Sequence, residues 1–171
     1  MRWLNVLLLV SVLAACAPSA TLGISDNQRA DWKLQSVIQG FQPNKGASST
    51  YQVGEYATFG FTTSQPGYVT LVGLDPDGSL QELERNVLLP AGAQIFPLKT
   101  DKNAQGAQAA YVLTEPTGPE KMWLIYTNVP GAAEARFRGK PSPQEFAQLM
   151  YKFIAAASVR DIAETKFEVV K

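Results

Sequence analysis

The chain has 171 residues, with 15 Lys and Arg against 15 Asp and Glu, no histidine and a single cysteine. This length suits one domain whose core needs no disulfides, and the balanced charge gives no electrostatic basis for binding nucleic acid. The lack of histidine excludes Ser-His and Cys-His hydrolases and the usual zinc ligand sets. Paired carboxylates, lysine chemistry and hard-cation sites remain, but none has a recognisable signature, so we expect neither an enzyme nor a cofactor.

The first fifteen residues have the order of a secretory signal peptide. Arg2 is followed by an apolar run from Trp3 to Val12 and then by small residues. The run is shorter than the ~20 residues of a membrane-spanning helix. Residues 1–15 are therefore predicted to be a signal peptide.

The next feature is the only cysteine. Leu13, Ala14, Ala15 and Cys16 resemble the lipobox of bacterial lipoproteins, in which the chain is cut before the cysteine and its thiolate accepts the lipid. The resemblance implies an exported protein held at a membrane through lipidated Cys16. Position 17, directly after the cysteine, is alanine and not aspartate. In a host with two membranes, the resemblance therefore also implies transport to the outer membrane. The alternatives are an ordinary signal peptide with an incidental cysteine, or a buried N-terminal helix.

Residues 16–31 are small and polar with little apolar periodicity, which predicts a lipidated tether ahead of a single β-rich domain over 32–171. In that domain, short alternating or β-branched runs between Gly- and Pro-containing turns predict strands. The runs are 32–39, 55–63, 68–74, 79–83, two within 86–98, 110–115 and 121–128.

The grouping of these runs predicts the fold. We expect a three-strand meander over 55–83 and a hairpin of 110–115 with 121–128, whose nearly continuous apolar second strand should be central. Seven or eight strands with turns about every ten residues predict a mainly β fold, either an antiparallel β-sandwich or a partly open barrel.

One C-terminal amphipathic helix is predicted over about 143–157. Ser142 and Glu145 form a capping-box pattern, with Pro143 at the first helical position. Apolar residues then recur on one face: Phe146, Leu149, Met150, Phe153, Ile154 and Ala157. We expect this face to pack on the sheet, with docking on a partner or membrane as the alternative, and a final strand at about 163–170.

Three short motifs occur in order within residues 51–83: Val53-Gly54-Glu55, Gly67-Tyr68-Val69 and Asp75-Pro76-Asp77-Gly78. Together they resemble a bacterial family known as domain of unknown function 4384, and the resemblance extends over about 32–130. It implies a β-rich accessory module of secreted or lipid-anchored proteins, or one appended to protease-like and kinase modules. It assigns no catalytic residue.

Acidic pairs are the first candidate sites. Asp75 and Asp77 resemble the start of a calcium loop, but the later ligand positions do not fit, and a tight turn with Asp75 bonding forward and Gly78 at positive φ explains the same residues. They remain weak metal candidates. Glu82 and Glu84 should share one face of a strand, where a solvated pair is expected.

Aromatic residues are the second candidate site. Trp32, Tyr68, Trp123 and Tyr126 could form a ligand surface for an envelope glycan, although aromatic residues in strands usually belong to the core. The leading hypothesis is a non-catalytic, lipid-anchored envelope accessory protein that binds or organises a protein partner at the membrane surface. The alternative is a module that binds envelope polysaccharide or peptidoglycan. A carboxylate-only hydrolase would need an acidic cleft containing one carboxyl with a raised pKa.

Overall fold

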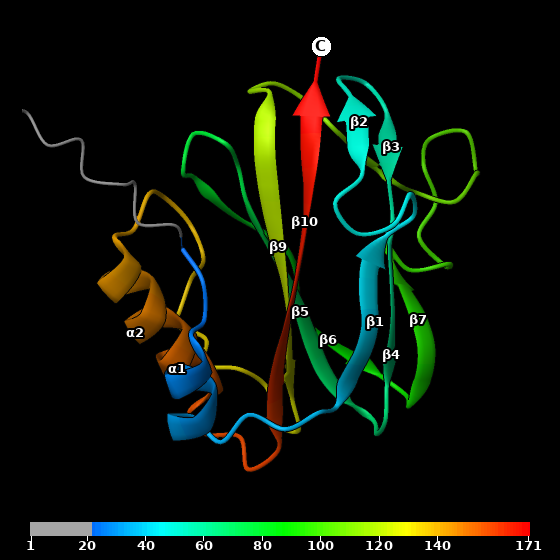
Figure 1. The fold of residues 1–171 in the computed structure, drawn as a ribbon. Coiled ribbons are helices and arrows are strands. Elements are labelled where there is room, and N and C mark those ends of the chain that lie inside the picture. Colours follow the sequence, from blue (N-terminus) through cyan, green and yellow to red (C-terminus); the bar gives the residue numbers. More distant parts are fainter. Residues whose placement is uncertain (1–21) are drawn as a thin grey trace, which may run out of the picture.

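The computed structural model describes residues 22–171 (Figure 1). Its elements follow one another in this order: α1 Asp26–Asp31, β1 Ile38–Pro43, β2 Thr50–Gln52, β3 Tyr56–Ala57, β4 Phe59–Thr63, β5 Gly67–Leu74, β6 Leu80–Leu89, β7 Gly92–Phe96, β8 Tyr111–Val112, β9 Gly118–Thr127, α2 Pro143–Ile154 and β10 Arg160–Val170.

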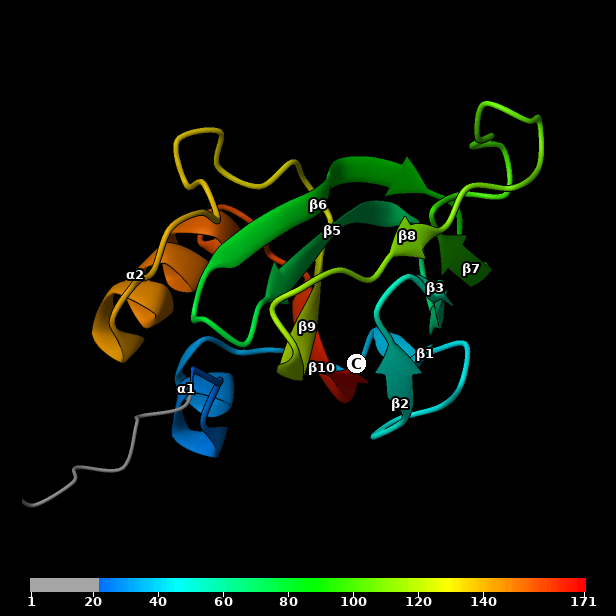
Figure 2. The same cartoon turned by 90° about the horizontal axis from the view of Figure 1, so that it is seen from above.

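The strands form three sheets. The largest has the order β2-β10-β9-β5-β6, a second has β1-β4-β7, and β3 pairs with β8. Every pairing is antiparallel except that of β2 with β10. The three- and five-stranded sheets pack face to face with the helices on the far side of the larger one (Figure 2), so the prediction of a mainly β sandwich with a C-terminal helix is confirmed.

Strand β9 is central, as predicted, because both of its faces are buried. Met122, Leu124 and Tyr126 point into the core between the two large sheets. Trp123 and Ile125 point into a second core beneath the helices. A strand covered on both sides needs apolar residues at successive positions, which explains the unbroken apolar run.

Helix α2 also matches its sequence pattern. The Ser142 hydroxyl accepts a hydrogen bond from the Glu145 N–H, and the Glu145 carboxylate accepts one from the Ser142 N–H, so the capping box is formed. Phe146, Met150 and Phe153 are buried in the second core. The apolar face therefore packs on the five-stranded sheet.

The start of the described chain differs from the prediction. Residues 26–31 of the expected tether form helix α1, capped by Ser25 and Gln28, and Leu22 is already buried. The expected strand at 32–39 is wrong, because the chain turns after α1 and β1 begins only at Ile38. The pattern Ser-x-x-Gln at 25–28 was the missed helix-start signal.

Two predicted groupings of strands are also wrong. Residues 55–83 are not a meander, since β4 pairs with β1 and β7 while β5 lies in the other sheet. Strand β8 pairs with β3 rather than forming a hairpin with β9. Only the β5–β6 hairpin around the turn at 75–78 forms as expected.

Candidate functional site

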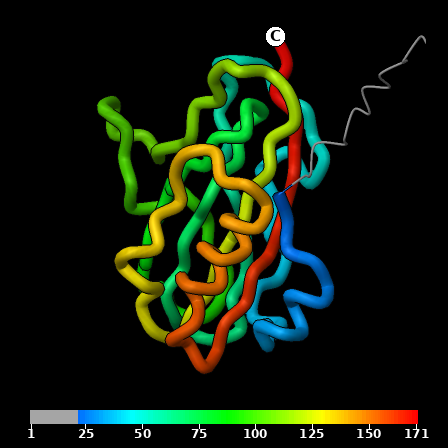
Figure 3. The backbone as a smooth tube through the Cα atoms, turned by 90° about the vertical axis from the view of Figure 1, so that its left-hand side faces the viewer, coloured from blue at the N-terminus to red at the C-terminus, as the bar shows by residue number. Residues whose placement is uncertain are grey.

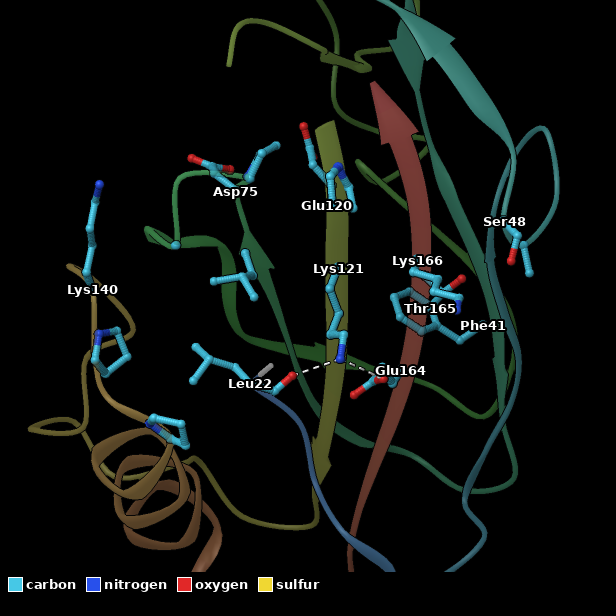
Figure 4. Close-up of a pocket in the computed structure, with 17 residues that line it drawn as sticks. Leu22, Phe41, Ser48, Asp75, Glu120, Lys121, Lys140, Glu164, Thr165 and Lys166 are labelled. Atoms are coloured by element: carbon cyan, nitrogen blue, oxygen red, sulfur yellow. Dashed lines mark hydrogen bonds and ion pairs between the residues drawn. The ribbon is translucent and has the colours of Figure 1, made fainter. Parts of the chain in front are cut away.

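The main hollow is a groove of about 790 Å³ on the helix side of the five-stranded sheet. Seen from that side, α2 lies across part of the strands and leaves the upper part of β10 uncovered (Figure 3). The groove crosses this uncovered part, from Lys140 and Pro141 ahead of α2 to Ala47 and Ser48 in the loop before β2. Its floor comes from the end of β5, the start of β9 and the middle of β10 (Figure 4).

Lys121 connects Leu22, at the start of the described chain, to the groove floor. Its Nζ donates a hydrogen bond to the Leu22 carbonyl at 2.8 Å and lies 3.2 Å from Glu164 Oε1, as Figure 4 shows. Glu164 Oε2 accepts a hydrogen bond from Trp123 Nε1 at 2.8 Å. Both carboxylate oxygens are thus engaged, so Lys121 and Glu164 hold the fold together and offer little to a ligand.

Lys166 lies directly opposite Lys121 in the register of β9 with β10. It is exposed on the groove floor, and within residues 22–171 its ammonium forms no ion pair. Like charges directly opposite one another in a sheet are destabilising. Lys166 is therefore a cation in the groove without a counter-charge from the described chain.

Glu120 lies at the other side of the groove, next to Asp75. Burial raises the pKa of Glu120 to about 7, and the nearby Asp75 carboxylate adds to this increase. The described chain supplies it with neither a hydrogen bond nor an ion pair. Burial also raises the pKa of Asp75, opposed by a hydrogen bond from Gln81. The groove thus contains two neighbouring carboxyls whose ionisation is disfavoured.

Asp75 and Asp77 form the predicted turn. The Asp75 carbonyl accepts the Gly78 N–H at 2.9 Å, and Gly78 has φ +86°, but it is the Asp77 carboxylate that bonds forward, to the Ser79 N–H at 2.9 Å. Asp77 also pairs with Lys140 at 2.9 Å, and these partners lower its pKa to about 2. Across residues 22–171 no cluster of three metal-ligating side chains is found.

Glu82 and Glu84 do not share a face, contrary to expectation. The pairing of β5 with β6 is irregular here, so that Glu82 stands opposite Val72 and Glu84 opposite Leu71. These two partners belong to different cores. Glu82 is held by Arg85, and Glu84 accepts a hydrogen bond from the Tyr111 hydroxyl at 2.8 Å.

The candidate aromatic surface is not formed. Trp123 and Tyr126 are fully buried, in different cores, and Trp32 is 9% exposed. Tyr68 is half-buried on β5. These four side chains therefore cannot stack on a glycan together, because three of them are packed in the interior.

Lys121, Glu120 and Lys166 were not predicted from the sequence as site residues. Two of them do break a pattern that is visible in the sequence, because Glu120 and Lys121 interrupt the otherwise apolar β9 at its start. Polar residues at one end of a central strand could have indicated a site there. Lys166 gave no such signal, since alternating charged residues are normal in a half-exposed strand.

The predicted lipidation motif, Leu13, Ala14, Ala15 and Cys16, lies outside the described residues. Neither helix in the described part is long and apolar enough to cross a membrane.

Comparison with known proteins gives a family for much of the domain. Residues 50–130 match the family model described as Domain of unknown function (DUF4384). No match was found among curated proteins or among solved structures. The match covers β2 to β9, including the three motifs that carried the resemblance in the sequence. Over residues 50–130, the chain is therefore similar to the family described as Domain of unknown function (DUF4384).

Proposed function

We propose that this protein is a non-catalytic, lipid-anchored envelope protein whose groove holds an extended segment of a protein partner at the membrane surface. The groove itself is the observation that carries the proposal. It is large enough for several residues of an extended chain, and its walls combine apolar and proline side chains with charged groups of both signs.

The position of the groove fits an anchored protein. Leu22, the first described residue, lines the groove, and Cys16 stands only six positions earlier. Six Cα–Cα steps span at most about 20 Å. If Cys16 carries lipid, the groove lies close to the bilayer, where a membrane-associated partner would be found.

A photo-crosslinking residue tests the groove in intact cells. We expect benzoylphenylalanine at Pro119, exposed at the groove, to give one recurrent protein adduct, identified by mass spectrometry. The same residue at Leu88, exposed on β6 outside the groove, should give none. Ala47→Trp should suppress the Pro119 adduct by filling the groove. Equal adducts at both positions, or an adduct insensitive to Ala47→Trp, would refute the proposed groove function.

Membrane fractionation tests the anchor separately. Wild-type protein should remain with the membranes, and protein carrying Cys16→Ser should move to the soluble fraction. Identical fractionation of the two would refute the anchoring part of the proposal.

A second candidate function, hydrolysis of an envelope glycan, is favoured by one observation. Glu120 has a pKa of about 7 beside Asp75 in an open groove, and glycosidases use such a carboxyl as the general acid with a second carboxylate. Release of fragments from purified peptidoglycan by wild-type protein, lost with Glu120→Gln, would establish this function and refute the non-catalytic proposal.

A further inference from the structure

One edge of β10 has a short stretch of backbone without partners. The Lys166 carbonyl accepts a hydrogen bond from the Ser48 N–H at 2.8 Å, and the Glu168 N–H donates one to the Ser49 carbonyl at 2.9 Å. Backbone groups alternate in direction along a strand, so the N–H and C=O of Glu164 and the N–H of Lys166 point to this same edge. In the described part of the chain, none of these three groups has a hydrogen bond.

The stretch is short because both of its ends are covered. Toward the start of β10, the Ile162 carbonyl accepts a hydrogen bond from Arg29 Nη1 at 2.9 Å. Toward the end of β10, Ser48 covers the Lys166 carbonyl, and β2 pairs from Glu168 onward. Between them lies a row of N–H, C=O and N–H. Unpaired backbone groups at a strand edge are a template for pairing with another chain.

The groove gives access to this edge. Glu164, Lys166 and Ser48 all line the groove, and so does Phe41 of β1, from the other sheet. Figure 4 shows Ser48 on the side of β10 away from Lys121, which is the side of the unpaired groups. These groups therefore border a hollow.

The chemistry of the row identifies its occupant. A carboxylate or phosphate could accept from the two N–H groups, but its oxygens would also meet the Glu164 carbonyl oxygen, which needs a donor. In an extended peptide, the groups that face a neighbouring strand alternate between C=O and N–H. Such a peptide can satisfy all three groups at once, in either strand direction, as in peptide recognition by strand addition.

We infer that the partner's extended segment binds as a short added strand on β10, through main-chain hydrogen bonds to Glu164 and Lys166. This inference rests on the proposed function and adds the way in which the segment is held. The residue of the partner that donates to the Glu164 carbonyl cannot be proline, which has no N–H. The side chains of Glu164 and Lys166 are not needed for these bonds.

Hydrogen exchange tests the edge itself, read at single residues by mass spectrometry on the full chain purified in detergent. In the free protein, the N–H groups of Glu164 and Lys166 should exchange at least about tenfold faster than those of Ala163 and Thr165, which face β9. In the Pro119 adduct, they should become as slow as these neighbours. Slow exchange in the free protein would mean that the chain's own N-terminal residues or a second copy already cover the edge. That result, or exchange unchanged in the adduct, would overturn the inference.

Two substitutions at one position test the inference in intact cells. Lys166→Pro removes an N–H that the pairing with β9 does not use, whereas Lys166→Ala removes the side chain and keeps the N–H. Lys166→Pro should weaken the Pro119 adduct about tenfold, since at least one main-chain hydrogen bond is lost and the proline ring occupies the edge. Lys166→Ala should leave the adduct unchanged. Both variants should keep the melting temperature of the parent.

The outcomes separate the two proposals. An adduct that survives Lys166→Pro would overturn the inference but leave groove binding intact. So would an adduct lost in both variants, which would assign the contact to the ammonium group. If the parent gives no Pro119 adduct, both proposals fail. If Lys166→Pro does not fold, the exchange comparison decides, because it needs no substitution on β10.

Discussion

Asp161 shows how one side chain can join two sheets. It lies at the start of β10 and is buried, and its Oδ2 accepts hydrogen bonds from the N–H groups of Val37 and Ile38, each at 2.8 Å. Its Oδ1 accepts the Ile162 N–H at 2.8 Å. The carboxylate thus attaches the beginning of β1, in the three-stranded sheet, to β10 in the five-stranded one.

Replacing this carboxylate should be costly. Asp161→Ala leaves buried N–H groups of Val37 and Ile38 without an acceptor, and each bond to a charged group contributes about 1.5–3 kcal/mol. We expect the free energy of unfolding in urea to fall by about 3 kcal/mol. Glu168→Ala, an exposed acid on the same strand, should change it by less than about 0.5 kcal/mol. Equal losses in the two variants would contradict this role of Asp161.

Glu120 should make stability depend on pH. Its pKa is about 7 in the folded protein against 4.5 ordinarily, so between these values the folded chain holds a proton that the unfolded chain has released. Raising the pH from 5 to 8 should therefore destabilise the wild type relative to Glu120→Gln. Because the side chain is partly exposed, we expect a relative loss of about 1 to 2 kcal/mol. Denaturant unfolding at both pH values measures it, and Glu168→Gln should follow the wild type. A pH-independent difference between wild type and Glu120→Gln would refute this.

At the scale of elements, α2 depends on its N-terminal cap. The Ser142 hydroxyl supplies an acceptor to the first turn, whose N–H groups have no partner within the helix. Ser142→Ala should lower the free energy of unfolding by about 1 kcal/mol, measured by urea denaturation. Gln148→Ala, at an exposed position in the same helix, is the matched control and should be neutral or slightly stabilising. A loss no larger than that of the control would show that the cap is unimportant.

Elements were predictable from sequence where local rules decide them. Strand β9 and helix α2 each carry a long pattern, continuous apolar residues in one and a capped amphipathic stripe in the other, and both formed as expected. The partners of short strands were not predictable. Strand β4 leaves its neighbour β5 for the other sheet, and β8 joins β3 some 55 residues earlier, because non-local packing and not local sequence decides which edges meet.

At the scale of the whole molecule, the site too has one part that was predictable from the sequence and one part that was not. The turn at 75–78 could be predicted because Gly78 and the aspartates decide it locally. The groove could not, because it depends on where α2 stops covering the sheet and on the registry that sets Lys121 against Lys166. The prediction that Trp123 and Tyr126 belong to a ligand surface was wrong for a related reason, because a central strand buries both of its faces.

If the chain is anchored through Cys16, the orientation of the whole molecule on the membrane follows from the same geometry. Leu22 and Lys140 line one groove, and helix α1 follows Leu22 closely in the chain. The 97–110 loop lies at the opposite side of the molecule from α1 in both Figure 1 and Figure 2. If lipid is attached at Cys16, the groove side must stay near the bilayer, because the intervening chain spans at most about 20 Å.

Cysteine labelling tests this orientation. Cys16 is the only cysteine and its thiol would be blocked by lipid, so a new cysteine is the sole site for a fluorophore. In vesicles containing lipids with a quenching headgroup, a fluorophore at Lys140→Cys should be quenched several-fold more than one at Lys102→Cys, since the latter lies in the loop at the far side. Unlabelled vesicles control for direct effects of the membrane on emission. Equal quenching at the two positions would mean that the groove does not face the membrane, and the partner would then have to reach it from the opposite side.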